Sequence, residues 1–253
     1  WAVLSWGTHR MPPRGLQTAL SLIYPPRCLG CGGVVDADFG LCGGCWRDTS
    51  FIGGTVCDAC GVPLPGGGDV ASLYCDACLA TPRPWAQGRT ALLYRDMGRK
   101  LVLALKHGDR QEIARPAARW MAQTAQGILP QEALIVPVPL HWRRSLKRRY
   151  NQSALLAKAL SAETGHSWCP DLLQRVRRTP SLDGLGRVER FSVLQEAIRV
   201  HPRRRHRIIA RPVILVDDVF TSGATLTACT EACLAAGSGP VFVLALARVA
   251  KET

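Results

Sequence analysis

Residues 213–225, VILVDDVFTSGAT, constrain the fold more than any other segment of the chain. Four apolar residues in a row are typical of a strand buried in a parallel sheet. Two acids, Asp217 and Asp218, follow at once, and small and hydroxyl residues then lead into a helical pattern. Because ligands of open α/β sheets bind at the carboxyl ends of the strands, the segment predicts a strand, a binding loop and a helix in succession.

The residue types of this loop suit a sugar phosphate. Adjacent carboxylates accept hydrogen bonds from neighbouring sugar hydroxyls, so we expect Asp217 and Asp218 to hold a ribose and to be the catalytic acids. Backbone N–H groups of a small-residue loop curl around phosphate, and a following helix adds its positive end. The expected 5-phosphate residues are Thr221, Ser222, Gly223, Ala224 and Thr225. A Walker loop is excluded because no lysine follows Gly223; the alternative is an ordinary strand–turn–helix with solvated acids.

Strand and helix patterns alternate from residue 88 onward. The expected strands are 88–94, 133–139, 213–216 and 241–249, and the expected helices are 96–106, 113–126, 151–164 and 226–236. Asn151 is a good N-cap and Gly165 a good C′ residue for the third helix. Strands separated by helices predict an α/β fold with a parallel sheet and helices on both faces. An N-terminal extension, residues 1–24, is expected to hold one short helix.

Eight of the eleven cysteines form four C-x-x-C pairs. The pairs are Cys28/Cys31, Cys42/Cys45, Cys57/Cys60 and Cys75/Cys78. A two-residue gap lets both sulfurs reach one tetrahedral ion, and a structural zinc contributes about 10–16 kcal/mol of apparent binding energy to a module that lacks a core. We predict two structural Zn²⁺ ions. Sequential pairing is favoured because the enclosed loops, 32–41 and 61–74, are ribbon-sized; crossed pairing stays open.

The formal net charge of +13 is unevenly distributed. Residues 141–211 carry 17 Lys and Arg against 5 Asp and Glu, whereas residues 28–78 carry six Asp and one basic residue, Arg47. The basic part predicts contact with a polyanion such as single-stranded DNA, and the acidic part predicts contact with protein. No apolar window is long enough for a membrane span. Without a signal peptide pattern we expect a cytoplasmic protein, with Met11 as an alternative start to Trp1.

Residues 213–225 resemble the motif of type I phosphoribosyltransferases that binds 5-phosphoribosyl 1-pyrophosphate (PRPP). Residues 135–152, IVPVPLHWRRSLKRRYNQ, together with LKHG at 105–108 and the cysteine pairs, resemble the ComF family of competence-associated proteins from about residue 11 to residue 248. The resemblance implies a double zinc ribbon (25–82) joined to a phosphoribosyltransferase-like domain (83–253) that binds PRPP with Mg²⁺. It also implies a role in DNA uptake during natural transformation, beside a helicase-like partner.

The basic loop after the second expected strand would cradle pyrophosphate in a transferase of this kind. The residues expected there are Lys106, Pro139, Arg143, Arg144, Arg148, Arg149 and Asn151. Residues 179–198, near the lid of such enzymes, depart from the family pattern, with Leu182 and Val193 at positions of expected amides. Three functions therefore stay open: a transferase working on or near single-stranded DNA, a non-catalytic DNA-binding adaptor with a ligand-sensing pocket, and a nucleobase phosphoribosyltransferase.

Overall fold

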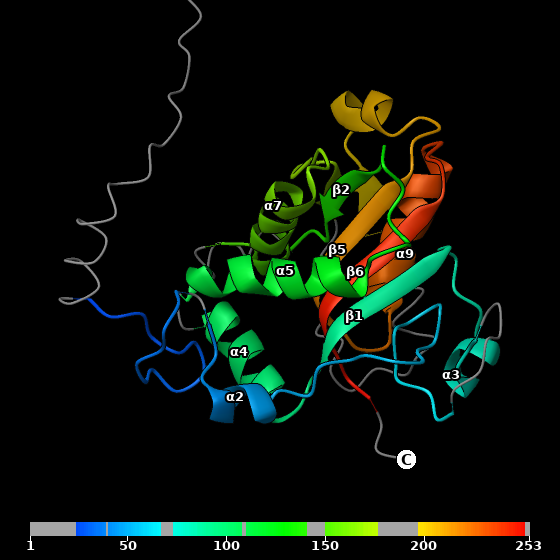
Figure 1. The fold of residues 1–253 in the computed structure, drawn as a ribbon. Helices are drawn as coiled ribbons and strands as arrows, with labels where there is room; N and C mark the ends of the chain where they lie inside the picture. Colours follow the sequence, from blue (N-terminus) through cyan, green and yellow to red (C-terminus); the bar gives the residue numbers. More distant parts are fainter. Residues whose placement is uncertain are drawn as a thin grey trace, which may run out of the picture.

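A parallel four-stranded sheet forms the centre of the protein (Figure 1). The computed structural model describes residues 24–38, 40–66, 73–107, 110–140, 150–176 and 197–250. The strands are β1 (Gln87–Leu93), β2 (Leu134–Pro137), β5 (Val213–Phe220) and β6 (Val241–Arg248). Their order is β1-β6-β5-β2, and every neighbouring pair is parallel. The helix expected before residue 24 lies outside the described residues.

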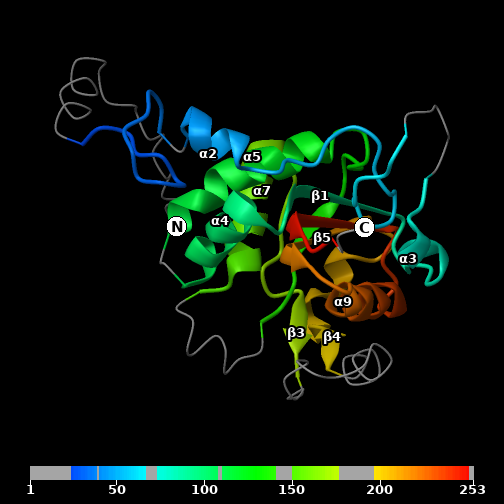
Figure 2. The same ribbon diagram turned by 90° about the horizontal axis from the view of Figure 1, so that it is seen from below.

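Helices cover both faces of this sheet, as expected. The elements on one face are α4 (Asp96–His107), α5 (Ala114–Thr124) and α7 (Gln152–Thr164), with the short η1 (Gln111–Ile113) leading into α5. The other face carries α9 (Ala224–Ala235) and a small antiparallel sheet of β3 (Leu173–Arg175) and β4 (Ile198–Val200), as Figure 2 shows. Along β5, Ile214 and Val216 join the first core while Val213 and Leu215 join the second. The α/β class is thereby confirmed.

The central strands and the helix caps follow the sequence pattern, with two differences. Asn151 accepts a hydrogen bond from Ser153 N at 3.0 Å as the N-cap of α7, and Gly165 ends that helix at φ 76°. β5 is longer than expected because its pairing with β6 continues to Phe220 and Arg248, so Asp217 and Asp218 lie inside the strand. α9 begins at Ala224, two residues earlier than expected.

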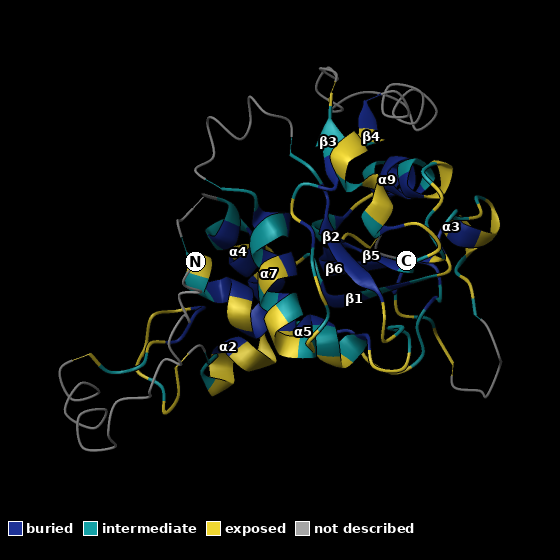
Figure 3. Cartoon of the chain, turned by 90° about the horizontal axis from the view of Figure 1, so that it is seen from above, coloured by how far each residue is buried: buried dark blue, intermediate teal, exposed yellow. Residues whose placement is uncertain are grey.

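The β3–β4 hairpin and the 3-10 helix η2 (Pro202–Arg207) had no expected counterpart as regular elements. The basic run 203–207, whose composition suits either a solvated turn or part of a polyanion-binding face, lies in this 3-10 helix. Pro202 begins η2, and His201 caps it by accepting a hydrogen bond from Arg203 N at 3.1 Å. Most residues of η2 are exposed, while the neighbouring β5 and β6 are buried (Figure 3).

The cysteine-rich segment runs along the free edge of β1. Two short helices belong to it, α2 (Gly43–Arg47) and α3 (Asp76–Leu79). Between its two halves, Ile52 N donates to Ala91 O and Leu93 N donates to Ser50 O, both at 2.9 Å. The segment therefore pairs with β1 and covers an edge strand that would otherwise present unpaired backbone groups. No helix in the described part of the chain is both long and apolar enough to cross a bilayer.

Candidate functional site

The paired cysteines gather into two groups of four sulfur atoms. The groups are Cys28, Cys31, Cys42 and Cys45, and Cys57, Cys60, Cys75 and Cys78, and within each group all sulfurs lie within 4.8 Å of one another. The Cys31–Cys42 and Cys60–Cys75 sulfur pairs are each 3.7 Å apart. A tetrahedral zinc ion with Zn–S bonds of about 2.3 Å requires sulfur separations of about 3.8 Å. Both groups therefore fit a structural zinc ion, in the sequential pairing.

In the first group, backbone amides donate hydrogen bonds to a cysteine sulfur and stabilise its thiolate form. Cys42 N donates to Cys28 Sγ at 3.2 Å, and Gly30 N donates to the same sulfur at 3.4 Å. Burial acts to raise the pKa of Cys28, but hydrogen bonds from Cys42, Cys31 and Gly30 outweigh it and lower the pKa to about 6. Because the thiolate is the form that binds zinc, the folded backbone favours the ligating state.

The two acids of β5 have different partners. Asp217 Oδ1 accepts hydrogen bonds from Ser153 Oγ and from Asp218 N, each at 2.9 Å. Asp218 Oδ2 lies 3.1 Å from Lys106 Nζ, and the two side chains are only 13% and 18% exposed. Lys106, expected in the pyrophosphate set, therefore meets the acid pair directly.

The surroundings of Asp217 favour its neutral form. Desolvation, followed by the negative charge of Asp218, raises the pKa of Asp217 to about 7. Hydrogen bonds from Asp218 N and Ser153 Oγ and the charge of Lys106 act in the opposite direction. The fold has removed water from around the Asp217 carboxylate. A cation or a set of sugar hydroxyls bound beside the two acids would therefore take the place of that water.

Most backbone N–H groups from Thr221 to Thr225 have no acceptor within the described residues. Gly223, at φ 84°, forms the N-cap of α9. Among the N–H groups of Thr221–Thr225, that of Ala224 alone finds an acceptor within the described residues, Ser222 Oγ at 3.4 Å. Free N–H groups at the start of a twelve-residue helix are the donors that bind anions in other proteins, and here they begin three residues after Asp218.

The residues expected around pyrophosphate are only partly described. Arg143, Arg144, Arg148 and Arg149 lie outside the described residues, and Pro139 follows β2 in an irregular segment. Asn151 caps α7 with its oxygen and donates from Nδ2 to Val138 O at 3.1 Å, so its amide already has two backbone partners. Its role toward pyrophosphate stays a prediction.

Sequence reasoning missed three side chains near the site. Ser153 reaches Asp217 from the first turn of α7. Arg83 Nη1 donates to Ser222 O at 3.1 Å, and Arg248 Nη1 donates to the carbonyls of Phe220 and Thr221. A signal for Arg248 exists, since it is a cation that ends an apolar strand parallel to the strand of Asp217. Ser153 and Arg83 carry no comparable local signal.

The fold and the site define a class: two four-cysteine zinc ribbons joined to a parallel α/β domain with an acid pair near the carboxyl edge of its sheet. Residues 19–79 match the family model described as a double zinc ribbon domain. DNA utilization protein YhgH of Escherichia coli K12 is 32% identical over 217 residues, covering 83% of this chain and 91% of the relative. Competence protein F of Haemophilus influenzae is 29% identical over 230 residues, covering 88% and 96%. The chain belongs to the ComF family.

More distant similarities are also found. Competence protein ComFC of Bacillus subtilis is 25% identical over 193 residues, which is 74% of each chain. Among solved structures, the allosteric regulatory enzyme of purine biosynthesis superposes on 53% of this chain and 26% of its own, with a TM-score of 0.34 and 16% identity.

Proposed function

We propose that the protein binds PRPP, or a closely related sugar phosphate, at the carboxyl edge of its sheet. One observation carries the proposal: the acid pair of β5 is followed within a few residues by backbone N–H groups that have no acceptor in the described part of the chain. Carboxylates suit neighbouring sugar hydroxyls, and free amides at a helix start suit a phosphate. The short spacing between the two supports a ribose 5-phosphate as the shared ligand.

In this proposal each part of the ligand has its own residues. Asp217 and Asp218 accept hydrogen bonds from the ribose hydroxyls, and the amides and hydroxyls of Thr221–Thr225 hold the 5-phosphate. Lys106 and the basic residues of 141–149 are proposed to bind the pyrophosphate. Before the ligand arrives, the ion pair between Lys106 and Asp218 neutralises the site. When the ligand binds, Lys106 moves from Asp218 toward the incoming phosphate.

Magnesium belongs to the same proposal. Mg²⁺ prefers hard oxygen ligands and is commonly held by one or two carboxylates plus substrate phosphates, and the Asp217–Asp218 pair supplies such carboxylates. When bound, Mg²⁺ would neutralise charge on the leaving pyrophosphate. Ser153 and Asp218 N would keep Asp217 oriented toward the ligand.

The cellular setting is proposed from the relatives. Their names describe DNA utilization and competence, so we propose that this protein works in DNA uptake, in the cytoplasm, on or near single-stranded DNA and beside a helicase-like partner. Residues 179–196 of the expected lid region, 179–198, lie outside the described part of the chain.

Isothermal titration calorimetry of the zinc-loaded protein with PRPP and Mg²⁺ tests the ligand. We expect saturable binding that Asp218→Asn weakens about tenfold or more, since hydrogen bonds to a charged group contribute about 1.5–3 kcal/mol. Glu163→Gln is the matched control, because Glu163 pairs with Arg119 on the surface. No heat with PRPP, or equal affinity in Asp218→Asn and Glu163→Gln, would refute the proposal.

A second candidate, a DNA-binding adaptor that senses ligand without turnover, is favoured by the exposed arginines of η2. Arg203 and Arg205 are exposed, on the same side of the sheet as α9. Removing one cation that binds a phosphate of single-stranded DNA reduces the salt slope by roughly 0.7. A triple Lys147→Ala, Arg148→Ala, Arg149→Ala variant and a double Arg203→Gln, Arg205→Gln variant would show which segment binds. Pyrophosphate release with any base would favour the transferase instead.

A further inference from the structure

Two arginines bind backbone carbonyls at the start of the phosphate loop, the segment Thr221–Thr225 that is proposed to hold the 5-phosphate. Arg83 precedes β1 and donates from Nη1 to Ser222 O at 3.1 Å. Arg248 ends β6, is 7% exposed, and donates from Nη1 to Phe220 O at 3.2 Å and to Thr221 O. Three successive carbonyls, from Phe220 to Ser222, are thus occupied by guanidinium groups. None of these contacts is needed to form the strand or the helix.

The same two arginines pack against the buried cluster of the second zinc site. Arg83 lies over the Trp85 ring and Arg248 over the Phe220 ring, and both rings belong to the cluster that contains Cys57, Cys60 and Cys78. Because zinc is divalent and four thiolates bring one negative charge each, the loaded centre is anionic and attracts both guanidinium groups. Each arginine therefore binds the phosphate loop directly and is connected to the second zinc site through an aromatic ring.

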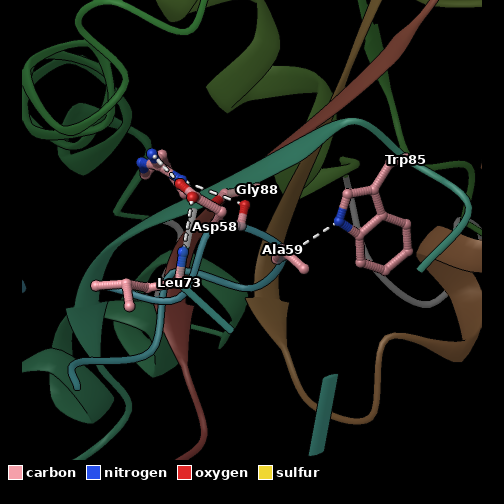
Figure 4. A network of polar contacts seen from close by, with 6 residues as sticks. Asp58, Ala59, Leu73, Trp85 and Gly88 are labelled. Carbon is pink, nitrogen blue, oxygen red and sulfur yellow. Dashed lines mark hydrogen bonds and ion pairs between the residues drawn. The ribbon is translucent and has the colours of Figure 1, made fainter. Parts of the chain in front are cut away.

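Aromatic packing fixes this connection in place. Trp85 and Phe220 meet edge to face with centroids 5.8 Å apart. The Arg248 guanidinium carbon lies 4.2 Å from the Phe220 ring centroid, and that of Arg83 lies 5.6 Å from the Trp85 ring. Trp85 also donates from Nε1 to Ala59 O at 2.6 Å, between the ligands of the Cys57–Cys60 knuckle (Figure 4).

The knuckle itself is anchored to β1 rather than left free. Gly88 N donates to Asp58 O at 2.7 Å (Figure 4). Arg89 pairs with the Asp58 carboxylate at 2.8 Å. Thr90 Oγ1 donates to Cys60 O at 3.1 Å. A Cβ at Gly88 would collide with Ala59 O, so the close approach of the two backbones requires glycine. The knuckle is therefore bonded both to the start of β1 and to Trp85.

The first zinc site provides an internal comparison. Its Cys28 and Cys45 belong to the core cluster of α4 and α5, and a Cβ on Gly30 would meet Met97 of α4. The second site belongs to the cluster of α9, with Phe220 and Ala224. Each site thus packs against a different face of the domain, and among the described residues the second alone borders the loop.

We propose that Arg83 and Arg248 are positioning residues that couple zinc in the second site to the shape of the phosphate loop. This inference rests on the proposed function, because it gives that binding site a structural control. Cations bind the carbonyls of residues 220–222. In the same peptide groups, the N–H groups of residues 221–223 therefore point toward the opposite side. Polarised carbonyls also make the N–H groups of the same peptide chain stronger donors.

Inorganic phosphate and PRPP with Mg²⁺ are the probes of the first experiment. We expect Arg83→Gln and Arg248→Gln in the full chain to weaken binding of both about tenfold, the effect of losing one charge-assisted hydrogen bond to the loop. Arg119→Gln, on the exposed face of α5, is the matched control. Cys75→Ser should weaken phosphate binding while Cys31→Ser should not, with zinc content measured for each.

A second experiment needs no ligand. Release of zinc to a chromophoric chelator is followed in the intact chain, and Cys31→Ser assigns which phase belongs to which site. Arg83→Gln, Arg248→Gln and Gly223→Ala should each speed release from the second site severalfold and leave the first unchanged. Gly223→Ala acts from the loop side, because its Cβ would lie 3.1 Å from Arg83 Nη1.

The two experiments separate the possible failures. Altered zinc release in a protein that binds neither phosphate nor PRPP would refute the proposed function and keep the coupling. Normal PRPP binding in both arginine variants, with zinc release like that of Arg119→Gln, would overturn the coupling and keep the proposed function. If Cys75→Ser does not fold, the arginine variants still decide, because they leave all eight ligands in place.

Discussion

Lys106 Nζ lies 3.1 Å from Asp218 Oδ2, and both side chains are largely buried. The pair joins the last turn of α4 to β5, across more than a hundred residues of sequence. Removing one member of a buried pair leaves an uncompensated charge, which costs more than the pair itself contributes. This contact therefore links the stability of the domain to the chemistry of its acid pair.

Lys106→Gln should reduce both stability and ligand affinity. We expect a loss of roughly 1–3 kcal/mol in the free energy of unfolding, measured by urea denaturation, and a clear loss of PRPP affinity by calorimetry. Lys106→Arg keeps the charge and should retain most of both. Lys158→Gln, an exposed lysine on α7, is the control, and an effect of the same size there would contradict the prediction.

Asp217→Asn should stabilise the unliganded protein above neutral pH. Burial and the charge of Asp218 raise the pKa of Asp217 from 3.8 to about 7, so the folded state holds a proton that the unfolded state has lost between those values. The stability from this group is therefore fully present below the lower value and is lost as pH rises through the higher one.

The asparagine variant cannot ionise, yet its oxygen can still accept from Ser153 and Asp218 N. Its stability relative to the parent should increase by roughly 4 kcal/mol between pH 4 and pH 8, since each unit of the pKa difference corresponds to about 1.36 kcal/mol. Chemical denaturation at several pH values measures this difference. A pH-independent difference would show that Asp217 keeps an ordinary pKa, and loss of PRPP binding in the same variant is the expected functional cost.

Gly223→Ala should weaken the loop. At φ 84° an L side chain is strained, and the added Cβ would lie 3.1 Å from both Arg83 Nη1 and the Phe220 ring. We expect about 1–2 kcal/mol of destabilisation in thermal or urea unfolding. Gly127→Ala, also at positive φ but with open space around it, separates backbone strain from crowding; equal losses in the two variants would exclude crowding.

A Cys31→Ser, Cys42→Ser double variant distinguishes the two ways of pairing the cysteines. Sequential groups lose one zinc ion and keep the second site intact, whereas crossed groups lose a ligand from both sites. We expect two zinc ions per parent chain and one per variant chain, counted by elemental analysis of purified protein. A variant with no bound zinc would support crossed pairing against the sulfur geometry.

Local chemistry made much of this protein predictable. The C-x-x-C spacing brings sulfurs together within a turn, Asn151 caps the helix that follows it, and the apolar run of β5 identifies a buried strand. Each of these signals acts over a few residues, so a single sequence is enough to read them.

The contacts that were missed are those between distant segments. Lys106 reaches Asp218, and Arg83 reaches Ser222 across 139 residues, and no local pattern records which buried cation meets which carbonyl. The β3–β4 hairpin has strands of three residues each, too short for an alternating pattern to be distinguished from a loop. The extra length of β5 comes from its pairing with β6, which only the folded sheet supplies.

The strip of residues beside β1 has one more consequence, for assembly. Ser50 and Ile52 occupy backbone positions on β1 that could otherwise accept a strand from another molecule. Chains made under zinc starvation would lack the metal that orders this strip, and their exposed edge would become a template for strand exchange between copies. Metal supply would then decide between monomer and edge-to-edge oligomer, and light scattering of chelator-treated protein would reveal that growth.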